Sequence, residues 1–303
     1  MSLVILAGTG NPPLAAAIAG ALGLRPGAAT VDRFPDGELR VEVHEDVKDK
    51  DVVLVQSMGP PSDRALLELV FLADAVRRLG AKSVTAAVPY LAYARQDSSA
   101  KTRGPLGARV VAELLQICGI QRLVALDLHS QAVEASFDVP VEHVSAIPLL
   151  ADELASRTAP GSVVVSPDLG GVARAEAYAR RLQLPVAVVR KTRLSGSDVS
   201  AGAVMGNVRG LSPIVVDDVI STGATIEAAV RALQAAGCSG DVTVAATHGL
   251  LVGGAIDRLG RLSLRRLLTT DSLPPPAEGA PFPIERVSVA GLMAKALAGA
   301  SSG

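Results

Sequence analysis

Aromatic residues and cysteines are scarce in this sequence, and both scarcities limit what the chain can be. Among its 303 residues there is no tryptophan, aromatic residues make up 2%, and there are two cysteines. Cys118 and Cys238, which fall near predicted helix ends, cannot build the disulfide framework of a small secreted domain. With 49% hydrophobic residues, the chain can still bury a large core, which must consist mainly of Ala, Val, Leu and Ile.

An excess of charge of one sign is also missing. The chain has 29 Lys and Arg against 30 Asp and Glu, a formal net charge of -1, which argues against a nucleic acid or a membrane surface as partner. No apolar run is long enough to cross a bilayer. The start, Met-Ser-Leu-Val-Ile-Leu-Ala-Gly, lacks the basic segment of a signal peptide and is typical of a first strand. We therefore expect a soluble, cytoplasmic enzyme.

Three common sequence motifs are absent. There is no Gly-x-x-x-x-Gly-Lys-Ser/Thr loop, which excludes an ordinary P-loop kinase. Gly8-Thr-Gly10 follows a predicted strand, but residue 13 is proline, so the dinucleotide-binding fingerprint fails. The four histidines are not spaced as zinc ligands.

Short apolar runs alternate with helical patterns along almost the whole chain. The runs are rich in Val and apolar on both faces, which is typical of central strands in a parallel sheet. Helices are predicted from Ser62 to before Gly80 and from Thr225 to before Gly237, because glycine readily takes the left-handed conformation that ends a helix. The predicted strands are residues 3–7, 52–56, 84–88, 123–128, 163–166, 186–189, 214–217 and 242–247.

The order of these elements predicts two domains. Residues 52–90 follow the order strand, loop, helix, strand, and residues 214–248 repeat it at nearly the same spacing. We therefore expect an α/β protein with two similar doubly wound domains and mostly parallel sheets. The boundaries are expected at residues 1–143 and 144–288, with a C-terminal helix at about 289–300 that returns to the first domain.

The most specific motif is Ile214-Val-Val-Asp-Asp-Val-Ile-Ser-Thr-Gly-Ala-Thr-Ile226. The backbone N–H groups from Ser221 to Thr225 lie where a helix begins, which favours a phosphate, and Gly223 lets the backbone approach it closely. Asp217 and Asp218 would repel a phosphate, so we expect them to accept hydrogen bonds from the hydroxyl groups of a ribose. An acidic helix N-cap is the plainer alternative.

This motif resembles the phosphoribosyl-binding loop shared by phosphoribosyltransferases and ribose-phosphate diphosphokinases. In that family the two acids hold the 2- and 3-hydroxyls of the sugar and the loop holds its 5-phosphate. The loop alone does not separate an enzyme that makes phosphoribosyl diphosphate from one that consumes it. The ribose 5-phosphate site that the resemblance implies consists of Asp217, Asp218, Ser221, Thr222, Gly223, Ala224 and Thr225.

Further segments are similar to the diphosphokinases, and the resemblance extends over about residues 1–298. Phe34-Pro-Asp-Gly-Glu38 resembles their adenine-binding segment, which a neighbouring subunit contributes, and Tyr93-Ala-Arg-Gln-Asp97 resembles their triphosphate-binding motif. On their own, these segments would be interpreted as a proline turn and a solvated loop. The resemblance implies a homo-oligomer, a dimer or larger, with an ATP site at a subunit boundary that contains Phe34, Asp36, Glu38, Arg95, Gln96 and Asp97.

The resemblance also implies a Mg²⁺ cofactor and a catalytic lid. His129, in Asp127-Leu-His, and Asp168, in Ser166-Pro-Asp-Leu-Gly-Gly, correspond to residues beside the magnesium ions of the family; Mg²⁺ keeps waters and takes most of its ligands from phosphates. Arg174, after the double glycine, is expected to contact phosphate. Lys191 and Arg193 begin a polar stretch and correspond to the catalytic pair of the lid, with a basic surface loop as the alternative.

The implied function is that of a ribose-phosphate diphosphokinase, which transfers the β,γ-diphosphoryl group of ATP to the C1 hydroxyl of ribose 5-phosphate and releases AMP. Two alternatives remain, a non-catalytic regulatory homologue and a phosphoribosyltransferase. Ser98, Ser99 and Gly104 depart from the common family pattern, and Ser98 and Ser99 keep the first of these alternatives open. The lid and the loop at residues 221–225 indicate a closer likeness to archaeal-type members.

Overall fold

The computed structural model describes residues 3–97, 103–190, 203–276 and 279–299, and between these the backbone of residues 192–195 and 198–200. The chain divides into two compact units. Unit 1 runs from the N-terminus to Ser145 and includes Ser272–Pro274 and the segment from Ser288 onward. Unit 2 consists of Ala146–Asp271 and Pro275–Val287.

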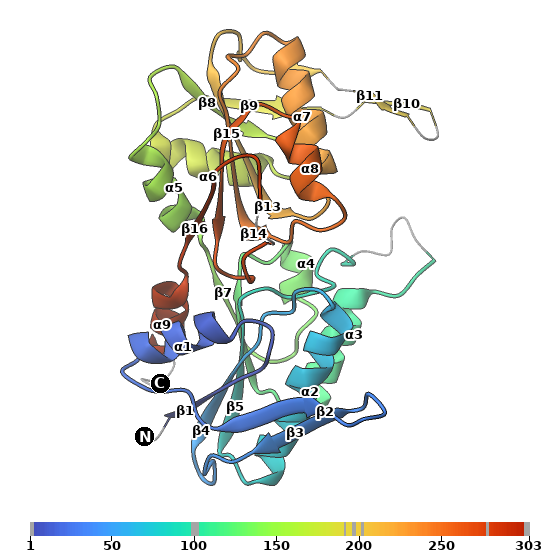
Figure 1. The fold of residues 1–303 in the computed structure, drawn as a ribbon, viewed down its shortest axis with the longest axis vertical. Coiled ribbons are helices and arrows are strands. Elements are labelled where there is room, and N and C mark those ends of the chain that lie inside the picture. Colours follow the sequence, from blue (N-terminus) through green and yellow to red (C-terminus); the bar gives the residue numbers. More distant parts are fainter. Residues whose placement is uncertain are drawn as a thin grey trace. The chain divides into compact units, whose positions relative to one another are not determined.

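Unit 1 is built on a parallel sheet covered on both faces by helices. Helices α1 (Pro12–Ala21) and α9 (Ala290–Gly299) contact each other on one face, and α2 (Ser62–Arg78) and α3 (Gly107–Ile117) pack on the other (Figure 1). The short helix α4 (Gln131–Glu134) follows the fourth strand of the sheet. The strands of the sheet, in spatial order, are β1 (Leu3–Ala7), β4 (Asp51–Val55), β5 (Ser83–Val88), β6 (Arg122–Leu126) and β7 (Val141–Val144).

Aliphatic side chains hold this sheet to its helices. Leu6 and Leu54 are fully buried and share a core cluster with Leu69 and Leu72 of α2, as expected for strands covered on both faces. Helix α2 ends as predicted before Gly80, which has a φ of 84°. Gly80 therefore forms the turn that ends the helix, and a residue with a Cβ would take this conformation only at a steric cost.

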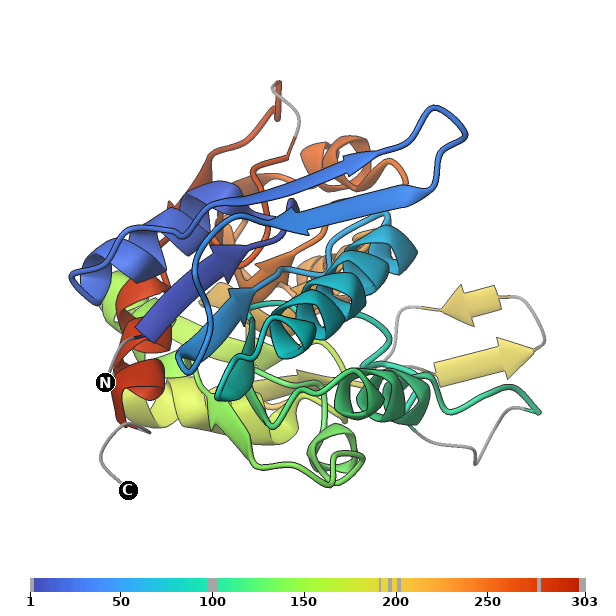
Figure 2. The ribbon, with the colours of Figure 1, turned by 90° about the horizontal axis from the view of Figure 1, so that it is seen from below.

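A two-stranded hairpin is attached to unit 1 and was not expected from the sequence. Strands β2 (Ala29–Arg33) and β3 (Leu39–Val43) pair antiparallel, and residues 34–38 form the connecting turn. Figure 2 shows the hairpin extending past the sheet, with β3 in contact with α2. Its strands carry charged residues and are only half-buried, so they lack the continuous apolar runs that marked the other strands.

Unit 2 contains a larger, mainly parallel sheet. Helices α5 (Ile147–Ala155) and α6 (Val172–Leu182) pack on one face, and α7 (Ala224–Ala235) and α8 (Ala255–Gly260) on the other (Figure 1). Strand β12 pairs antiparallel with β9, and the other neighbours are parallel. The strands, in spatial order, are β12 (Val204–Met205), β9 (Val186–Val189), β8 (Ser162–Ser166), β13 (Ser212–Ile220), β14 (Val242–Gly249), β15 (Leu264–Thr270) and β16 (Ile284–Val287).

The predicted fold class is confirmed, and several predicted boundaries are wrong. Strand β13 continues to Ile220, three residues beyond the predicted end, because it stays paired with β14 as far as Gly249. Strand β6 ends two residues early, where Asp127 takes a φ of 37°. Strands β7, β15 and β16 were missed. A separate antiparallel pair, β10 (Thr192–Ser195) and β11 (Asp198–Ser200), lies in the expected lid stretch.

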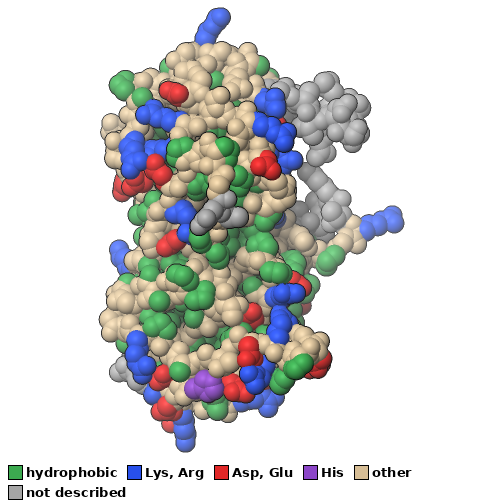
Figure 3. Space-filling model, viewed as in Figure 1, with side chains coloured by type: hydrophobic (Ala, Val, Ile, Leu, Met, Phe, Trp, Pro, Cys, Tyr) green, Lys and Arg blue, Asp and Glu red, His purple; other side chains and the backbone are tan. Residues whose placement is uncertain are grey.

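The surface carries both signs of charge. On the face shown in Figure 3, Lys and Arg side chains are interspersed with Asp and Glu, as expected from a net charge of -1. Within the part of the chain that the structure describes, no helix is long and apolar enough to cross a membrane.

Candidate active site

The loop between β13 and α7 has the geometry of an anion site. Strand β13 ends at Ile220 and α7 begins at Ala224, with Gly223 as its N-cap at a φ of 74°. A Cβ at this glycine would also lie 3.2 Å from Leu259 Cγ, so the backbone conformation and the packing both require glycine. The first N–H groups of α7 have no partner within the helix and lie at its positive end, which favours a bound phosphate.

Two buried carboxylates lie on β13 just before this loop. The Asp217 side chain is 16% exposed and that of Asp218 is 7% exposed. The guanidinium of Arg174, on α6, contacts both: Nη1 lies 3.2 Å from Asp217 Oδ1, and Nη2 lies 3.4 Å from Asp218 Oδ1. The sequence predicted that Arg174 contacts phosphate, whereas here it neutralises part of the charge of the acidic pair.

The acidic pair still holds a proton near neutral pH. Burial, followed by the hydrogen bond and the charge of Asp218, raises the pKa of Asp217, and Arg174 opposes them, so that the pKa becomes about 8. Sugar hydroxyls that donate to the pair would favour its ionised form. Hydroxyl groups that bind there would therefore promote the release of this proton.

This raised pKa predicts a pH-dependent stability. Because the folded pKa of Asp217 is above the ordinary value, its contribution is fully present below about pH 4 and is lost as the pH rises through about 8. The contribution of Asp217 to stability should therefore fall between about pH 4 and about pH 8, and over this range the melting temperature of Asp217→Asn should fall several degrees less than that of the ligand-free wild type. Calorimetric scans of both proteins check this. Parallel curves would mean that Asp217 does not hold the proton.

Asp168 lies just beyond the end of the strand next to this pair. It follows β8, which neighbours β13 in the sheet, so the carboxyl ends of both strands meet at one edge. Its Oδ1 accepts hydrogen bonds from the N–H groups of Gly170 and Gly171 at 3.0 and 3.2 Å. These bonds fix the direction of the carboxylate on the loop that leads into α6.

Unit 1 brings two other predicted segments together. Residues 95–97 follow β5 and His129 follows β6, and these strands are neighbours. Ser130 Oγ donates to Asp97 Oδ2, which ties the turn that carries His129 to the predicted triphosphate segment. Arg95, Gln96 and His129 are exposed.

The predicted adenine segment lies apart from these residues, in the turn of the β2–β3 hairpin. Phe34 is 45% exposed, and the guanidinium carbon of Arg40 lies 5.7 Å from the centre of its ring. Asp36 Oδ1 accepts the N–H of Glu38 at 3.0 Å, which shapes the turn. Asp36 and Glu38 are both exposed, so the segment is accessible to a ligand.

Some predicted residues fall outside the described part of the chain. Lys191, Ser98 and Ser99 are among them. Arg193 lies on β10, of which only the backbone is described. Among the residues that the structure does describe, no three His, Cys, Asp or Glu side chains are grouped as a metal site would require.

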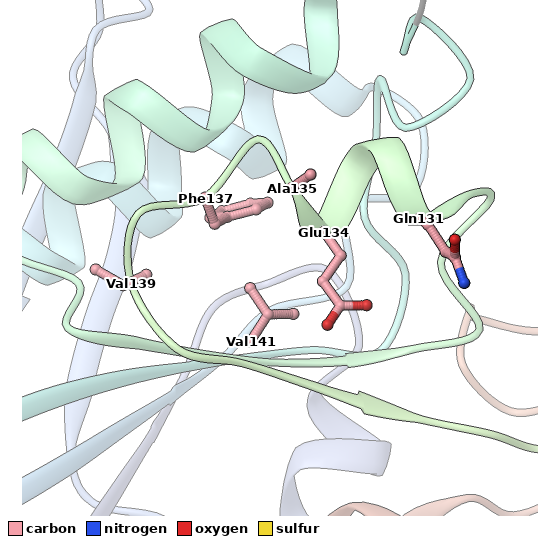
Figure 4. Close-up of a pocket in the computed structure, with 6 residues that line it drawn as sticks. All are labelled: Gln131, Glu134, Ala135, Phe137, Val139 and Val141. Carbon is pink, nitrogen blue, oxygen red and sulfur yellow. The ribbon is translucent and has the colours of Figure 1, made fainter.

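A hollow in unit 1, with a volume of about 470 Å³, does not suit a phosphate ligand. Figure 4 shows the Glu134 carboxylate at this hollow, between the apolar Val141 and the polar Gln131. A carboxylate would repel an anion. Phe137 and Val139 complete the apolar lining, so we place no substrate there.

One residue that contacts the anion loop gave no signal in the sequence. Arg258, on α8, donates from Nη1 to the carbonyl oxygen of Thr222 in the anion loop. It lies in an ordinary helical pattern, and only the adjacent Gly253-Gly254 marks a turn.

Comparisons with known proteins agree with this geometry. Residues 3–119 match the model of the N-terminal domain of ribose phosphate pyrophosphokinase, and residues 146–251 match that of the phosphoribosyl transferase domain. The ribose-phosphate pyrophosphokinase of Burkholderia pseudomallei is 39% identical over 97% of this chain and 92% of the relative. That of Marinomonas is 40% identical over 97% and 94%.

A solved structure is also similar over the full length. The crystal structure of phosphoribosylpyrophosphate synthetase from Mycobacterium smegmatis has a TM-score of 0.93 and 37% identity, and covers 99% of both chains. These relatives are bacterial, so the expected closeness to archaeal-type members is not borne out. With near-complete coverage at this identity, the chain belongs to the ribose-phosphate pyrophosphokinase family.

Proposed function

We propose that this chain transfers the β,γ-diphosphoryl group of ATP to the C1 hydroxyl of ribose 5-phosphate, giving phosphoribosyl diphosphate and AMP. The observation that carries this proposal is the near-complete coverage of relatives with this activity in their names, at 39 and 40% identity. The buried acidic pair beside an anion loop supports it, because one face of the site suits sugar hydroxyls and the other suits a phosphate.

Unit 2 would hold the ribose 5-phosphate. Asp217 and Asp218 accept hydrogen bonds from the ring hydroxyls, and residues 221–225 hold the 5-phosphate with their N–H and hydroxyl groups. Phe34, Asp36 and Glu38 bind the adenine, and Arg95, Gln96 and Asp97 hold the triphosphate. The segment with Phe34 would serve a neighbouring copy of the chain, which makes a homo-oligomer part of the proposal.

The transfer itself requires mainly positioning. The C1 oxygen forms a bond to the β-phosphorus and its hydroxyl proton passes to water, as the bond between that phosphorus and the oxygen bridging to the α-phosphorus breaks. AMP leaves with that oxygen. Such a transfer gains most from in-line alignment and charge neutralisation. Lys191, Arg193 and Arg95 would supply cationic donors to the phosphate oxygens.

His129 and Asp168 are the residues that we propose for Mg²⁺. Two donors with no third acidic or thiol partner among the described residues do not form a cage for a tightly held ion. They do suit Mg²⁺, which keeps water and takes most ligands from the phosphates of its substrate. When bound, the ion would neutralise charge on the ATP phosphates. Both substrates are cytoplasmic metabolites, so we also propose that the enzyme acts there.

The test is the identity of the products. The protein incubated with Mg-ATP and ribose 5-phosphate should form AMP and phosphoribosyl diphosphate in equal amounts, measured by anion-exchange chromatography. Formation of ADP and a ribose that carries two single phosphates, ribose 1,5-bisphosphate, would show that the γ-phosphorus is attacked. No turnover would favour the regulatory homologue, and consumption of phosphoribosyl diphosphate with a free base would favour a phosphoribosyltransferase.

A further inference from the structure

The outer side of the anion loop is held by one segment of unit 2. The N–H of Leu251 donates to the carbonyl of Ile220 at 3.0 Å, and the N–H of Val252 donates to the carbonyl of Ser221 at 3.0 Å. The next carbonyl along the loop, that of Thr222, accepts from Arg258 Nη1. Three consecutive loop carbonyls are thus bound from residues 251–258.

These bonds also set the direction of the loop N–H groups. In a trans peptide, the C=O of one residue and the N–H of the next lie in one plane and point in opposite directions. Fixing the carbonyls of Ile220, Ser221 and Thr222 therefore turns the N–H groups of Ser221, Thr222 and Gly223 away from residues 251–258. That is the side on which the phosphate of the sugar would bind.

The segment holds an unfavourable backbone conformation to make these contacts. Leu251 has a φ of 49°, and Gly253 and Gly254 have φ values of 59° and 75°. A left-handed conformation is unfavourable for leucine and persists only where the surroundings impose it. The Leu251 N–H donates to the Ile220 carbonyl from this conformation, so the hydrogen bond to the loop accompanies the unfavourable backbone.

Two of these three contacts come from backbone N–H groups, and the third comes from the side chain of Arg258. This side chain bridges the anion loop and helix α7. Besides the Thr222 carbonyl, its guanidinium contacts the Glu227 carboxylate in the first turn of α7, with Nε 3.1 Å from Oε2. Its side chain is 34% exposed and that of Glu227 is 25% exposed. Arg231 also contacts Glu227, with Nη2 2.9 Å from Oε1, but from within α7 itself.

We infer that Arg258 is a positioning residue for phosphate binding: it fixes the Thr222–Gly223 peptide so that the Gly223 N–H faces the 5-phosphate. This inference rests on the proposed function. A lysine at this position could reach the carbonyl or the carboxylate, but it lacks the fork that binds both. Arg231 shares the Glu227 carboxylate, so removing either arginine changes the local charge by the same amount, but Arg258 also contacts the loop carbonyl of Thr222.

The experiment compares Arg258→Met with the control Arg231→Met. Arg258→Met should raise the KM for ribose 5-phosphate roughly tenfold or more. The variant loses the hydrogen bond from the guanidinium to the Thr222 carbonyl, and the Gly223 N–H is then no longer held toward the 5-phosphate. The KM for ATP and kcat should stay within about threefold. Arg258→Lys should fall between wild type and Arg258→Met, and Arg231→Met should match wild type.

The outcomes separate this inference from the proposed function. If wild type is active and Arg258→Met behaves like Arg231→Met, the inference is wrong and the function stands. An equal loss in kcat and in both KM values would show a general structural role and would also overturn it. If wild type makes no AMP, the proposed function fails, and calorimetric binding of ribose 5-phosphate to the same variants decides the role of Arg258. Should Arg258→Met not fold, Arg258→Lys carries the same comparison.

Discussion

Replacing Lys191 with alanine should lower kcat by roughly 10²–10³-fold and change the KM values far less. The reason is that the lysine is expected to contact charge on the diphosphoryl group that develops only during transfer, and such an interaction lowers the barrier rather than binding the ground state. Steady-state kinetics with both substrates varied would measure the separation between kcat and KM.

The neighbouring Arg190 provides the control for this variant. It is an exposed cation directly after β9, and its N–H donates to the carbonyl of Ala203 at 2.9 Å, which alanine would preserve. Arg190→Ala therefore removes a positive charge beside Lys191 and should leave kcat within about twofold. If the two variants behaved alike, Lys191 would be an ordinary surface lysine and the catalytic assignment would be wrong.

The sequence predicted the parts of the fold whose signals are local. Strands such as residues 3–7 and 186–189 were bounded correctly, because they are apolar on both faces and end in turn residues. The hairpin of β2 and β3 and the strands β7 and β16 were missed. Their residues are half-exposed and interrupted by charges, and only their position beside another element makes them strands.

The Gly8-Thr-Gly10 segment has a structural role that the sequence did not predict. It was excluded as a dinucleotide site on the basis of residue 13. In the structure, the Thr9 N–H and hydroxyl donate to the buried Glu68 carboxylate, with the N–H at 3.0 Å. A Cβ on Gly10 would lie 2.1 Å from the carbonyl oxygen of Ser57. This segment therefore packs against Ser57 and Glu68, which are distant in sequence, and no local pattern could predict such contacts.

In the candidate site, too, the sequence predicted the local features and missed the contacts between distant residues. The acidic pair and the anion loop are contiguous in sequence, so the motif could predict them together. Arg174 and Arg258 come from α6 and α8, and their contacts with β13 and with Thr222 depend on the parallel order of the sheet and on the packing of α8 against α7. Sequence reasoning gave Arg174 a different partner and passed over Arg258, because both are single arginines on helices.

The acidic pair itself should be indispensable for sugar binding. Asp217→Asn and Asp218→Asn should each weaken the affinity for ribose 5-phosphate roughly 10- to 100-fold, and the double variant more, because each replaces a hydrogen bond to a charged acceptor. Asparagine keeps the size of the side chain and one oxygen acceptor, so the packing around Arg174 is disturbed less than by alanine. Titration calorimetry without ATP measures the sugar site alone.

The control for this loss is Asp241→Asn. Asp241 is exposed and immediately precedes β14, at the amino end of the strand, whereas the acidic pair is near the carboxyl end of the neighbouring β13. Asp241→Asn removes one carboxylate at the opposite end of the strands, so a loss of affinity that is confined to the acidic-pair variants would show a local effect at the site. Because Arg174 would lose an ionised partner in the acidic-pair variants, their affinity for inorganic phosphate should hold or increase. A uniform fall in affinity for sugar phosphate and phosphate alike would mean that these acids shape the loop instead of binding the ribose hydroxyls.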